Sequence, residues 1–153
     1  RAAHTWPSPP SFGGAAAQPA RRSAAGRCAA GGAEAPGGTE TEIKIGQTIP
    51  YSGPVSSRSV LGRTEAAYVK MINEQGGSNG RRLNFISVDD GYSPPKTVEM
   101  ARRLVDQDQL LFIWGSLGTP PNTAIHKYMN AKKTPQLFVF TGPSKWNDPK
   151  DFP

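Results

Sequence analysis

The sequence contains only one cysteine, Cys28, so no disulfide can form within the chain. No run of apolar residues approaches the roughly 18 that a membrane-spanning helix requires. The residues before Ile43 also lack an apolar stretch of about 7 to 15 residues, the usual core of a signal peptide. From the residues alone we therefore predict neither a membrane-spanning helix nor an export signal within this sequence.

Motifs of several enzyme classes are missing as well. There is no G-x-S-x-G nucleophile elbow, no Walker phosphate loop and no G-x-G-x-x-G after the first predicted strand. No nucleophile can be matched with a base, so we predict a binding protein without cofactors rather than an enzyme. A nucleotide-dependent enzyme on a similar α/β fold is a less favoured alternative.

Asp89 and Asp90 are adjacent carboxylates that could suggest a metal site. No Glu or His stands near them at ligand spacing, so we predict no metal. We expect their side chains to accept hydrogen bonds from turn amides before Gly91. Within a predicted helix, His126 is expected to be exposed.

Positive charge is present but not clustered. The chain has 18 Lys and Arg residues against 12 Asp and Glu, which gives a net charge of +6. Outside the first 42 residues, the basic residues include short pairs at 81–82, 102–103 and 132–133. No aromatic ladder or reading helix accompanies these pairs, so we predict a solvated basic surface and no nucleic-acid partner.

The composition divides the chain near Thr41. Residues 1–42 are mostly Ala, Gly, Pro, Arg and Ser, which bury too little apolar surface to offset the entropy of ordering, so we expect a disordered tail. Residues 43–153 carry regularly spaced aliphatic and aromatic side chains and are expected to fold. Because the first residue is Arg1 rather than Met, we expect a fragment or a processed product.

The folded region is predicted to alternate strands and helices in the order β-α-β-α-β-α-β. Strands are expected at 43–49, 83–88, 110–114 and 137–140. Helices are expected to follow the first three strands, and in the first of them six apolar residues share one face: Val60, Leu61, Ala67, Tyr68, Met71 and Ile72. Asn79-Gly80 predicts a tight turn. This alternation is typical of a doubly wound parallel sheet with right-handed crossovers.

Ligands of such sheets bind beyond the carboxyl ends of the strands, which directs attention to the loops 51–59, 89–92, 115–120 and 141–144. Gly118 and Thr119 lie where a helix begins, and its unpaired N–H groups would stabilise a carboxylate. The alternative is that Thr119 merely caps that helix.

The loop from Thr141 to Ser144 follows the next predicted strand. Its backbone carbonyl at Gly142 and its hydroxyl groups could accept hydrogen bonds from an ammonium group. An ordinary Gly-Pro turn is the alternative interpretation. Donors on one loop and acceptors on the other are the pairing that an α-amino acid requires.

Several segments, in this order and spacing, resemble the leucine/isoleucine/valine-binding family of type I periplasmic binding proteins. These segments are Ile43-Lys44-Ile45-Gly46 with Ser52-Gly53-Pro54, Ile72-Asn73-Glu74-Gln75-Gly76-Gly77 with Asn79-Gly80-Arg81, Asp89-Asp90 with Pro95-Lys96, 115–120 through Ala124-Ile125, and Pro135-Gln136-Leu137-Phe138. The resemblance covers about residues 43–153 and implies that this region is an incomplete first lobe of a two-lobed receptor.

The resemblance implies a periplasmic or extracytoplasmic receptor that delivers a small amino acid or related amide to an ABC permease. It implies that Thr119 holds the ligand carboxylate, that Gly142 offers a carbonyl to the ammonium group, and that Ser144 touches both. The sensing domain of a signalling receptor can share this fold and is the alternative. Because the second lobe normally completes the cage, the chain is expected to bind weakly or not at all.

Some positions depart from the family pattern. Arg58 and Ser59 stand where an aromatic residue followed by glycine is usual, and Arg58 either changes the pocket or points outward. Phe140 and Pro143 replace usual small residues, and Ser78 replaces a usual apolar one. These departures leave the identity of the solute open.

Overall fold

The computed structural model describes residues 36–148 and residue 150. Four strands form one parallel sheet in the order β2-β1-β3-β4. They are β1 (Glu42–Ile49), β2 (Arg82–Asp89), β3 (Phe112–Trp114) and β4 (Gln136–Leu137). β1 and β2 are paired along their whole length, from Glu42 opposite Arg82 to Ile49 opposite Asp89. The predicted parallel α/β sheet is confirmed.

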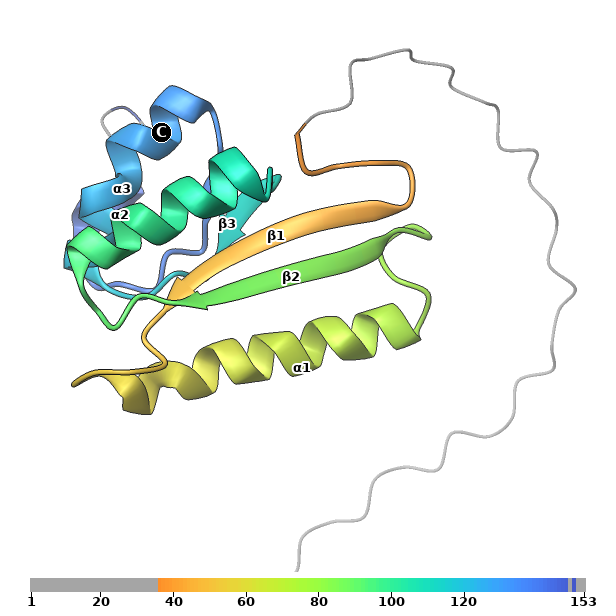
Figure 1. Ribbon diagram of the computed structural model, residues 1–153, viewed down its shortest axis with the longest axis horizontal. Coiled ribbons are helices and arrows are strands. Elements are labelled where there is room, and N and C mark those ends of the chain that lie inside the picture. The colour runs from red at the N-terminus through yellow and green to blue at the C-terminus, as the bar shows by residue number, and fades with distance from the viewer. Residues whose placement is uncertain (1–35, 149, 151–153) are drawn as a thin grey trace, which may run out of the picture. The chain divides into compact units, whose positions relative to one another are not determined.

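Helices lie on both faces of this sheet (Figure 1). One face is covered by α1 (Val60–Glu74), and the other by α2 (Pro94–Arg102) and α3 (Thr119–Lys132). α2 continues into the π-helical turn η2 (Arg103–Gln107), and the short 3-10 helices η1 (Ser56–Ser59) and η3 (Ser144–Asn147) lie in loops. Since β2 is on one side of β1 and β3 is on the other, the strand order reverses between β1 and β3, where doubly wound folds bind ligands.

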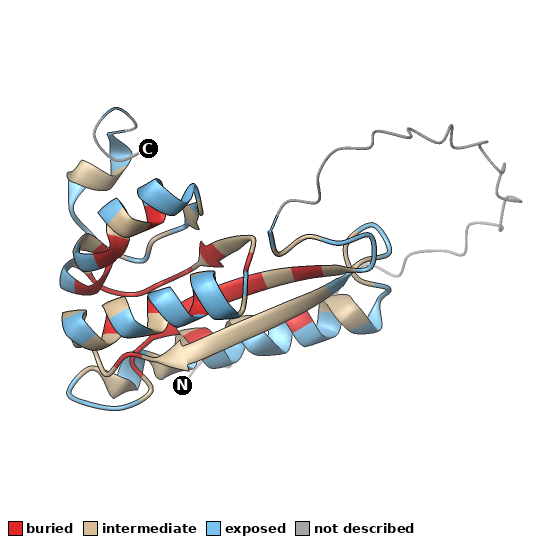
Figure 2. Ribbon diagram, turned by 45° about the horizontal axis from the view of Figure 1, so that its top comes forward, coloured by how far each residue is buried: buried red, intermediate tan, exposed pale blue. Residues whose placement is uncertain are grey.

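The apolar core lies between the sheet and the α2 and α3 helices, where Figure 2 shows most of the buried ribbon. Six fully or almost fully buried residues form it: Ala101, Leu104, Leu110, Ile113, Ile125 and Met129. Burying a side chain of the size of leucine or isoleucine stabilises a fold by about 1.5–3 kcal/mol. This cluster therefore fixes α2 and α3 on the sheet and, with them, the loops at the strand ends.

Sequence spacing predicts α1 correctly but predicts the wrong buried face. Val60 and Tyr68, both expected in the core, are 58% and 53% exposed. The buried residues of α1 are instead Gly62 and Val69, which lie two turns apart on another face of the helix. On the same side, Asn73 donates its Nδ2 to the carbonyl of Leu83 and accepts the Leu83 N–H, both at 2.8 Å. This face thus carries the small Gly62, the apolar Val69 and the polar Asn73, and the sheet beneath it contains the buried polar Gln47.

The last part of the predicted tail is ordered. Residues 1–35 lie outside the described residues, but Gly37 accepts the Lys44 N–H at 2.7 Å and the Thr39 hydroxyl accepts the Glu42 N–H at 2.9 Å. These contacts fold residues 37–41 back onto the start of β1. The chain therefore enters the sheet through a tight turn.

Both later strands are shorter than predicted. Phe138 has a φ of +54°, which ends β4 after Leu137 although apolar residues continue to Phe140. Gly115, opposite this bend, has a φ of +67° and ends β3. The parallel pairing resumes between Leu117 and Phe140. The two neighbouring strands thus bend at the same level of the sheet. No pattern of apolar residues in the sequence indicates this bend.

The turn between α1 and β2 is as predicted. Asn79 and Gly80 have φ values of 51° and 78°, the combination that favours Asn-Gly in a two-residue turn. Within the described part of the chain, no helix combines the length and apolar character needed to cross a membrane.

Candidate ligand-binding site

A groove of about 480 Å³ opens at the carboxyl edge of the sheet, beside the point where the strand order reverses. Five of the six predicted site residues line it: Arg58, Gly118, Thr119, Thr141 and Gly142. The remaining lining residues are Val55, Tyr92, Leu117, Val139 and Phe140. Ser144 is exposed at the start of η3 and does not line the groove.

The loop between β3 and α3 is held on both sides by backbone hydrogen bonds. The Gly118 N–H donates to the Phe140 carbonyl at 3.1 Å, and the Phe140 N–H donates to the Ser116 carbonyl at 2.9 Å. Gly118 has a φ of +105°, and a Cβ there would lie 2.5 Å from Cε2 of Tyr92. Only glycine fits this position without strain and without displacing the Tyr92 ring.

Thr119 begins α3 and does not cap it. Gly118 occupies the N-cap position and no side chain caps the helix, so the expected alternative for Thr119 is wrong. Pro120 and Pro121 have no N–H, and the Asn122 N–H donates to the Gly118 carbonyl at 3.2 Å. In the first turn of α3, the Thr119 N–H is thus the one backbone N–H whose hydrogen bond is accepted by no described residue.

A pair of hydroxyl groups lies beside that donor. The Oγ1 atoms of Thr119 and Thr141 are 2.5 Å apart, and either can donate to the other. Each hydroxyl has one hydrogen, and one of the two is used within the pair. The other hydrogen and the Thr119 N–H together can supply two donors for the two oxygens of a carboxylate.

Asn122 is a structural residue of this site that the sequence did not reveal. It is fully buried, and its Nδ2 donates to the carbonyls of Ser116 at 3.2 Å and of Gly118 at 2.7 Å. Its Oδ1 accepts from Nε2 of Gln136 at 3.1 Å. The amide therefore fixes both ends of the loop that carries Gly118. A polar residue immediately after Pro-Pro, on the inner side of the helix, is the signal that could have identified it.

A second buried amide lies under the same loop, on the α1 side of the sheet. Gln47, in β1, is fully buried and donates its Nε2 to Glu65 of α1 and to the Gly115 carbonyl, the latter at 3.3 Å. Its Oε1 accepts from the Ser87 hydroxyl at 2.9 Å, which is bonded in turn to the Tyr51 hydroxyl at 2.7 Å. This network connects the ends of β1, β2 and β3.

The carboxylate of Glu65 has no cationic partner among the described residues. Burial raises its pKa, and the hydrogen bond from Gln47 lowers it by a smaller amount. A Cβ on Gly115 would lie 2.5 Å from Oε1 of Glu65, so the loop backbone rests directly against this carboxylate.

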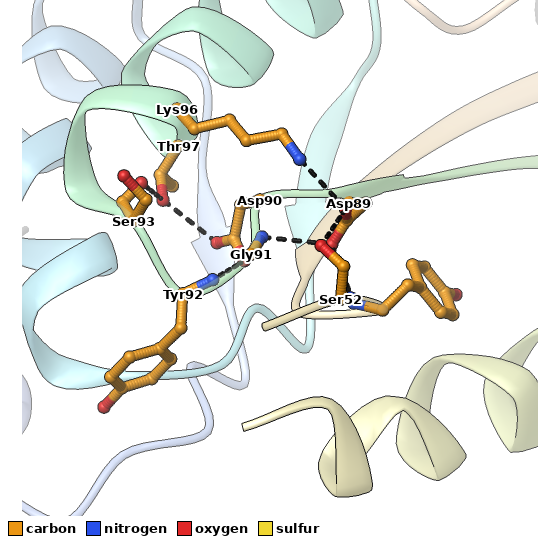
Figure 3. Close-up of polar contacts among 9 residues, drawn as sticks. Ser52, Asp89, Asp90, Gly91, Tyr92, Ser93, Lys96 and Thr97 are labelled. Atoms are coloured by element: carbon orange, nitrogen blue, oxygen red, sulfur yellow. Dashed lines mark hydrogen bonds and ion pairs between the residues drawn. The ribbon is translucent and has the colours of Figure 1, made fainter. Parts of the chain in front are cut away.

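Asp89, the last residue of β2, fastens the loop after β1 to α2 (Figure 3). Its Oδ1 accepts the N–H groups of Tyr51, Ser52 and Gly91 at 2.8, 3.0 and 3.0 Å. Its Oδ2 accepts from the Ser52 hydroxyl at 2.6 Å and from Lys96 Nζ at 2.9 Å. The expectation that this carboxylate bonds to turn amides is confirmed.

Asp90 points away from Asp89 and holds the next turn (Figure 3). It is fully buried, its Oδ1 accepts the Tyr92 N–H at 3.0 Å, and its Oδ2 accepts from the Thr97 hydroxyl at 2.9 Å. These contacts fix Tyr92, whose φ of +60° is unusual for an aromatic residue, against the groove. Among residues 36–148 and 150, no group of three or more His, Cys, Asp or Glu side chains could hold a metal.

The two carboxylates respond to acid in opposite ways. Burial alone would raise the pKa of Asp89, but hydrogen bonds from Ser52, Lys96 and the amide of Gly91 together hold it well below its usual range. Its contribution to stability is therefore complete above about pH 4 and is lost as the pH falls toward the folded-state pKa. Burial raises the pKa of Asp90, so its buried charge costs stability above that pKa. Protonation in acid removes this cost.

Replacing Asp89 with asparagine is expected to lower the free energy of unfolding by about 1 kcal/mol near neutral pH, a modest value because solvent reaches Lys96. The amide would place donors against the Ser52 hydroxyl and Lys96. In addition, Asp89→Asn should lose less stability than the wild type between about pH 7 and about pH 3. Urea unfolding at both pH values measures this, with the exposed Glu99→Gln of α2 as control. Equal acid sensitivity of Asp89→Asn and wild type would contradict the low pKa.

His126 and Trp146 lie apart from the 480 Å³ groove. They line a separate hollow of about 350 Å³ on the far side of the loop 138–143, and their rings meet edge to face with centroids 6.3 Å apart. His126 is half-buried rather than exposed, because its Nδ1 lies 2.7 Å from the Thr123 carbonyl and its ring packs on Trp146. Trp114 of β3 packs edge to face on Phe85 of β2 and does not line the groove.

Similarity to known proteins extends over most of the folded region. The sequence profile of the periplasmic binding protein family matches residues 42–153. A Pseudomonas aeruginosa protein described as an amino acid binding protein is 34% identical over 77 residues, 48% of this chain and 20% of its own length. A leucine-, isoleucine-, valine-, threonine- and alanine-binding protein of the same organism is 34% identical over 89 residues, 56% of this chain and 24% of its own. The chain thus spans about a fifth to a quarter of these relatives.

Solved structures share the fold. A possible leucine/isoleucine/valine-binding protein from Rhodopirellula baltica superimposes with a TM-score of 0.65 at 27% identity, over 70% of this chain and 29% of its own. A fatty acid ABC transporter substrate-binding protein from Thermomonospora curvata gives a TM-score of 0.58 at 26% identity, over 67% and 26%. A branched-chain amino acid transporter substrate-binding protein from Streptococcus pneumoniae, at 21% identity and a TM-score of 0.59 over 63% and 28%, shows the fold alone.

Proposed function

The chain belongs to the periplasmic binding protein family, and we propose that its groove forms one wall of the solute site of an ABC-transport receptor. The observation that carries this proposal is the convergence of the free Thr119 N–H and the Thr119–Thr141 hydroxyl pair in the groove at the carboxyl edge. Two donors at adjacent positions match the two oxygens of a carboxylate. The proposed solute is therefore a small carboxylic acid, with amino acids as the leading class.

The names of the related proteins support this ligand chemistry. One binds leucine, isoleucine, valine, threonine and alanine, and another serves fatty acid transport. Amino acids and fatty acids share a carboxylate and little else. The roles proposed for Thr119 and Gly142 assign the shared group to Thr119 and place the Gly142 carbonyl as an acceptor for an ammonium group. The contact of Ser144 with both the carboxylate and the ammonium group remains a prediction, and Ser144 lies outside the groove lining.

The setting proposed for this activity is that of the related transport proteins. The receptor would work in the periplasm or outside the cytoplasmic membrane and pass its solute to an ABC permease without chemical change. The described part of the site offers hydrogen-bond donors, a guanidinium group and apolar side chains. Such a set suits reversible binding, since solute release to a permease requires no bond to be made or broken.

Replacing both Thr119 and Thr141 with valine should weaken binding of leucine or valine by about 5- to 100-fold, because it removes the hydroxyl donor while keeping the shape. Both residues are changed because either hydroxyl can supply that donor. The amide signals of residues 119 and 141 in ¹⁵N-labelled protein provide the measurement, titrated up to millimolar amino acid. Thr64→Val, at an exposed position of α1, is the matched control. Weak binding is expected of one wall alone, and the proposal would fall if no amino acid or monocarboxylate moved these signals at any concentration up to about 50 mM, which corresponds to a binding free energy of only about 2 kcal/mol.

A further inference from the structure

The groove contains one formal charge, and it is positive. Among its ten lining residues Arg58 is the one with an ionised side chain, and none is acidic. Arg58 belongs to η1, whose backbone is held by hydrogen bonds from Arg58 N–H to the Val55 carbonyl at 2.9 Å and from Ser56 N–H to the Gly53 carbonyl at 3.2 Å. Arg58, whose side chain is exposed, is therefore held at the rim of the groove by an ordered segment.

The two acidic side chains at the end of β2 are committed elsewhere. Asp89 accepts five hydrogen bonds, three from backbone amides and two from Ser52 and Lys96. Asp90 is fully buried and satisfied by Tyr92 and Thr97. Neither can turn toward Arg58 without breaking the loop, and no carboxylate of the described residues forms an ion pair with it. The positive charge at the groove is thus uncompensated.

We propose that Arg58 makes this groove selective for solutes with two carboxylates, such as dicarboxylic acids and acidic amino acids. The inference rests on the proposed function and names its substrate class. One carboxylate would take the donors of Thr119 and Thr141, and the other would pair with the fork of Arg58 N–H groups, which matches a carboxylate in a two-point geometry. The apolar side chains of Val55, Leu117, Val139 and Phe140 would pack along the carbon chain between them.

Glutarate and valerate are a matched pair of ligands for testing this, since both have five carbons and they differ by one carboxylate. On the wild-type chain at constant ionic strength, glutarate should bind at least about tenfold more tightly than valerate, the usual effect of hydrogen bonds to a charged group. Arg58→Gln should bring this ratio close to one, because it should weaken the binding of glutarate much more than the binding of valerate. Chemical-shift titration of the Thr119 and Thr141 amides measures all four affinities.

Arg63→Gln is the control, because Arg63 is an exposed residue of α1 that does not line the groove. It lowers the net charge of the chain by the same amount as Arg58→Gln, so it separates a local contact from general attraction of a dianion to a basic protein. The wild-type ratio of glutarate to valerate affinity should persist in Arg63→Gln. A parallel titration with glutamate and glutamine, which both carry an ammonium group and differ by one carboxylate, should show the same preference for the solute with two carboxylates.

Each result has a distinct meaning. Equal affinities for glutarate and valerate, or a ratio that survives Arg58→Gln, would overturn the selectivity while leaving carboxylate binding intact. Binding of leucine or valerate with exclusion of glutarate would overturn it as well. If no carboxylate binds at all, the proposed function fails and the selectivity fails with it.

Discussion

Replacing Gln47 with leucine is expected to lower the free energy of unfolding by about 3 kcal/mol. The change leaves polar groups of three elements buried without a hydrogen-bond partner. The Gln47 amide donates to the Glu65 carboxylate and to the Gly115 carbonyl and accepts from the Ser87 hydroxyl. Leucine has nearly the same size but no polar atom. The largest part of the loss should come from Glu65, which would keep a half-buried charge with no donor.

A double replacement separates this penalty from loss of packing. If the unpaired carboxylate dominates, Gln47→Leu combined with Glu65→Leu should be more stable than Gln47→Leu alone, because removing both partners avoids a buried unpaired charge. Urea unfolding of the two single variants and the double variant measures the coupling. Gln75→Leu, at an exposed position just after α1, is the control and should change stability by less than about 0.5 kcal/mol. Additive losses in the double variant would contradict the proposed role of the network.

Replacing Asn122 with aspartate is expected to cost about 3 kcal/mol near neutral pH, although the two side chains have almost the same shape. The Nδ2 group of Asn122 faces the carbonyls of Ser116 and Gly118, so a carboxylate oxygen there would meet two acceptors instead. The destabilisation has a definite pH dependence. Burial beside carbonyls would raise the pKa of the new carboxyl, so the penalty is full above that pKa and is relieved as protonation restores a donor.

Thermal or urea unfolding of Asn122→Asp between about pH 7 and about pH 4 measures this relief, relative to the wild type at each pH. Asn130→Asp lies on the same helix with an exposed side chain and should show neither the loss nor the pH dependence. A second measurement tests the site itself, because Asn122 anchors both sides of the loop that carries Gly118. The amide signals of 116–119 should shift more in Asn122→Asp than in Asn130→Asp, and equal shifts would show that Asn122 does not hold the loop.

Patterns of apolar residues predicted the order of the elements because they report burial. In the run from Ile43 to Ile49, isoleucine stands at three of the four alternate positions, and the run forms an inner strand with β2 on one side and β3 on the other. The loops of the site could also be placed, since the carboxyl ends of parallel strands meet at one edge. Five of the six candidate ligand residues accordingly line one groove.

The remaining features depend on contacts between distant residues. A glutamine in the middle of an apolar strand was visible in the sequence, but nothing local indicates that Gln47 contacts Glu65 of α1 and Gly115. The choice of the buried face of α1 also depends on distant residues, because Gly62 lies close to Tyr51 and Gln47. On the same face, Asn73 bonds to Leu83 of β2. The bend at Phe138 is set by the matching bend at Gly115 on the neighbouring strand.

Pro120 and Pro121 give the groove a preference between kinds of anion. A tetrahedral anion such as phosphate or sulfate presents several oxygens, and helix starts that bind it well offer several free amides. Here two of the first three residues of α3 have no N–H, and the turn keeps the single free amide of Thr119. A flat carboxylate can be satisfied by that amide and one hydroxyl, whereas a tetrahedral anion would leave oxygens without donors. The two pyrrolidine rings thus favour carboxylates over the inorganic oxyanions that usually compete for the start of a helix.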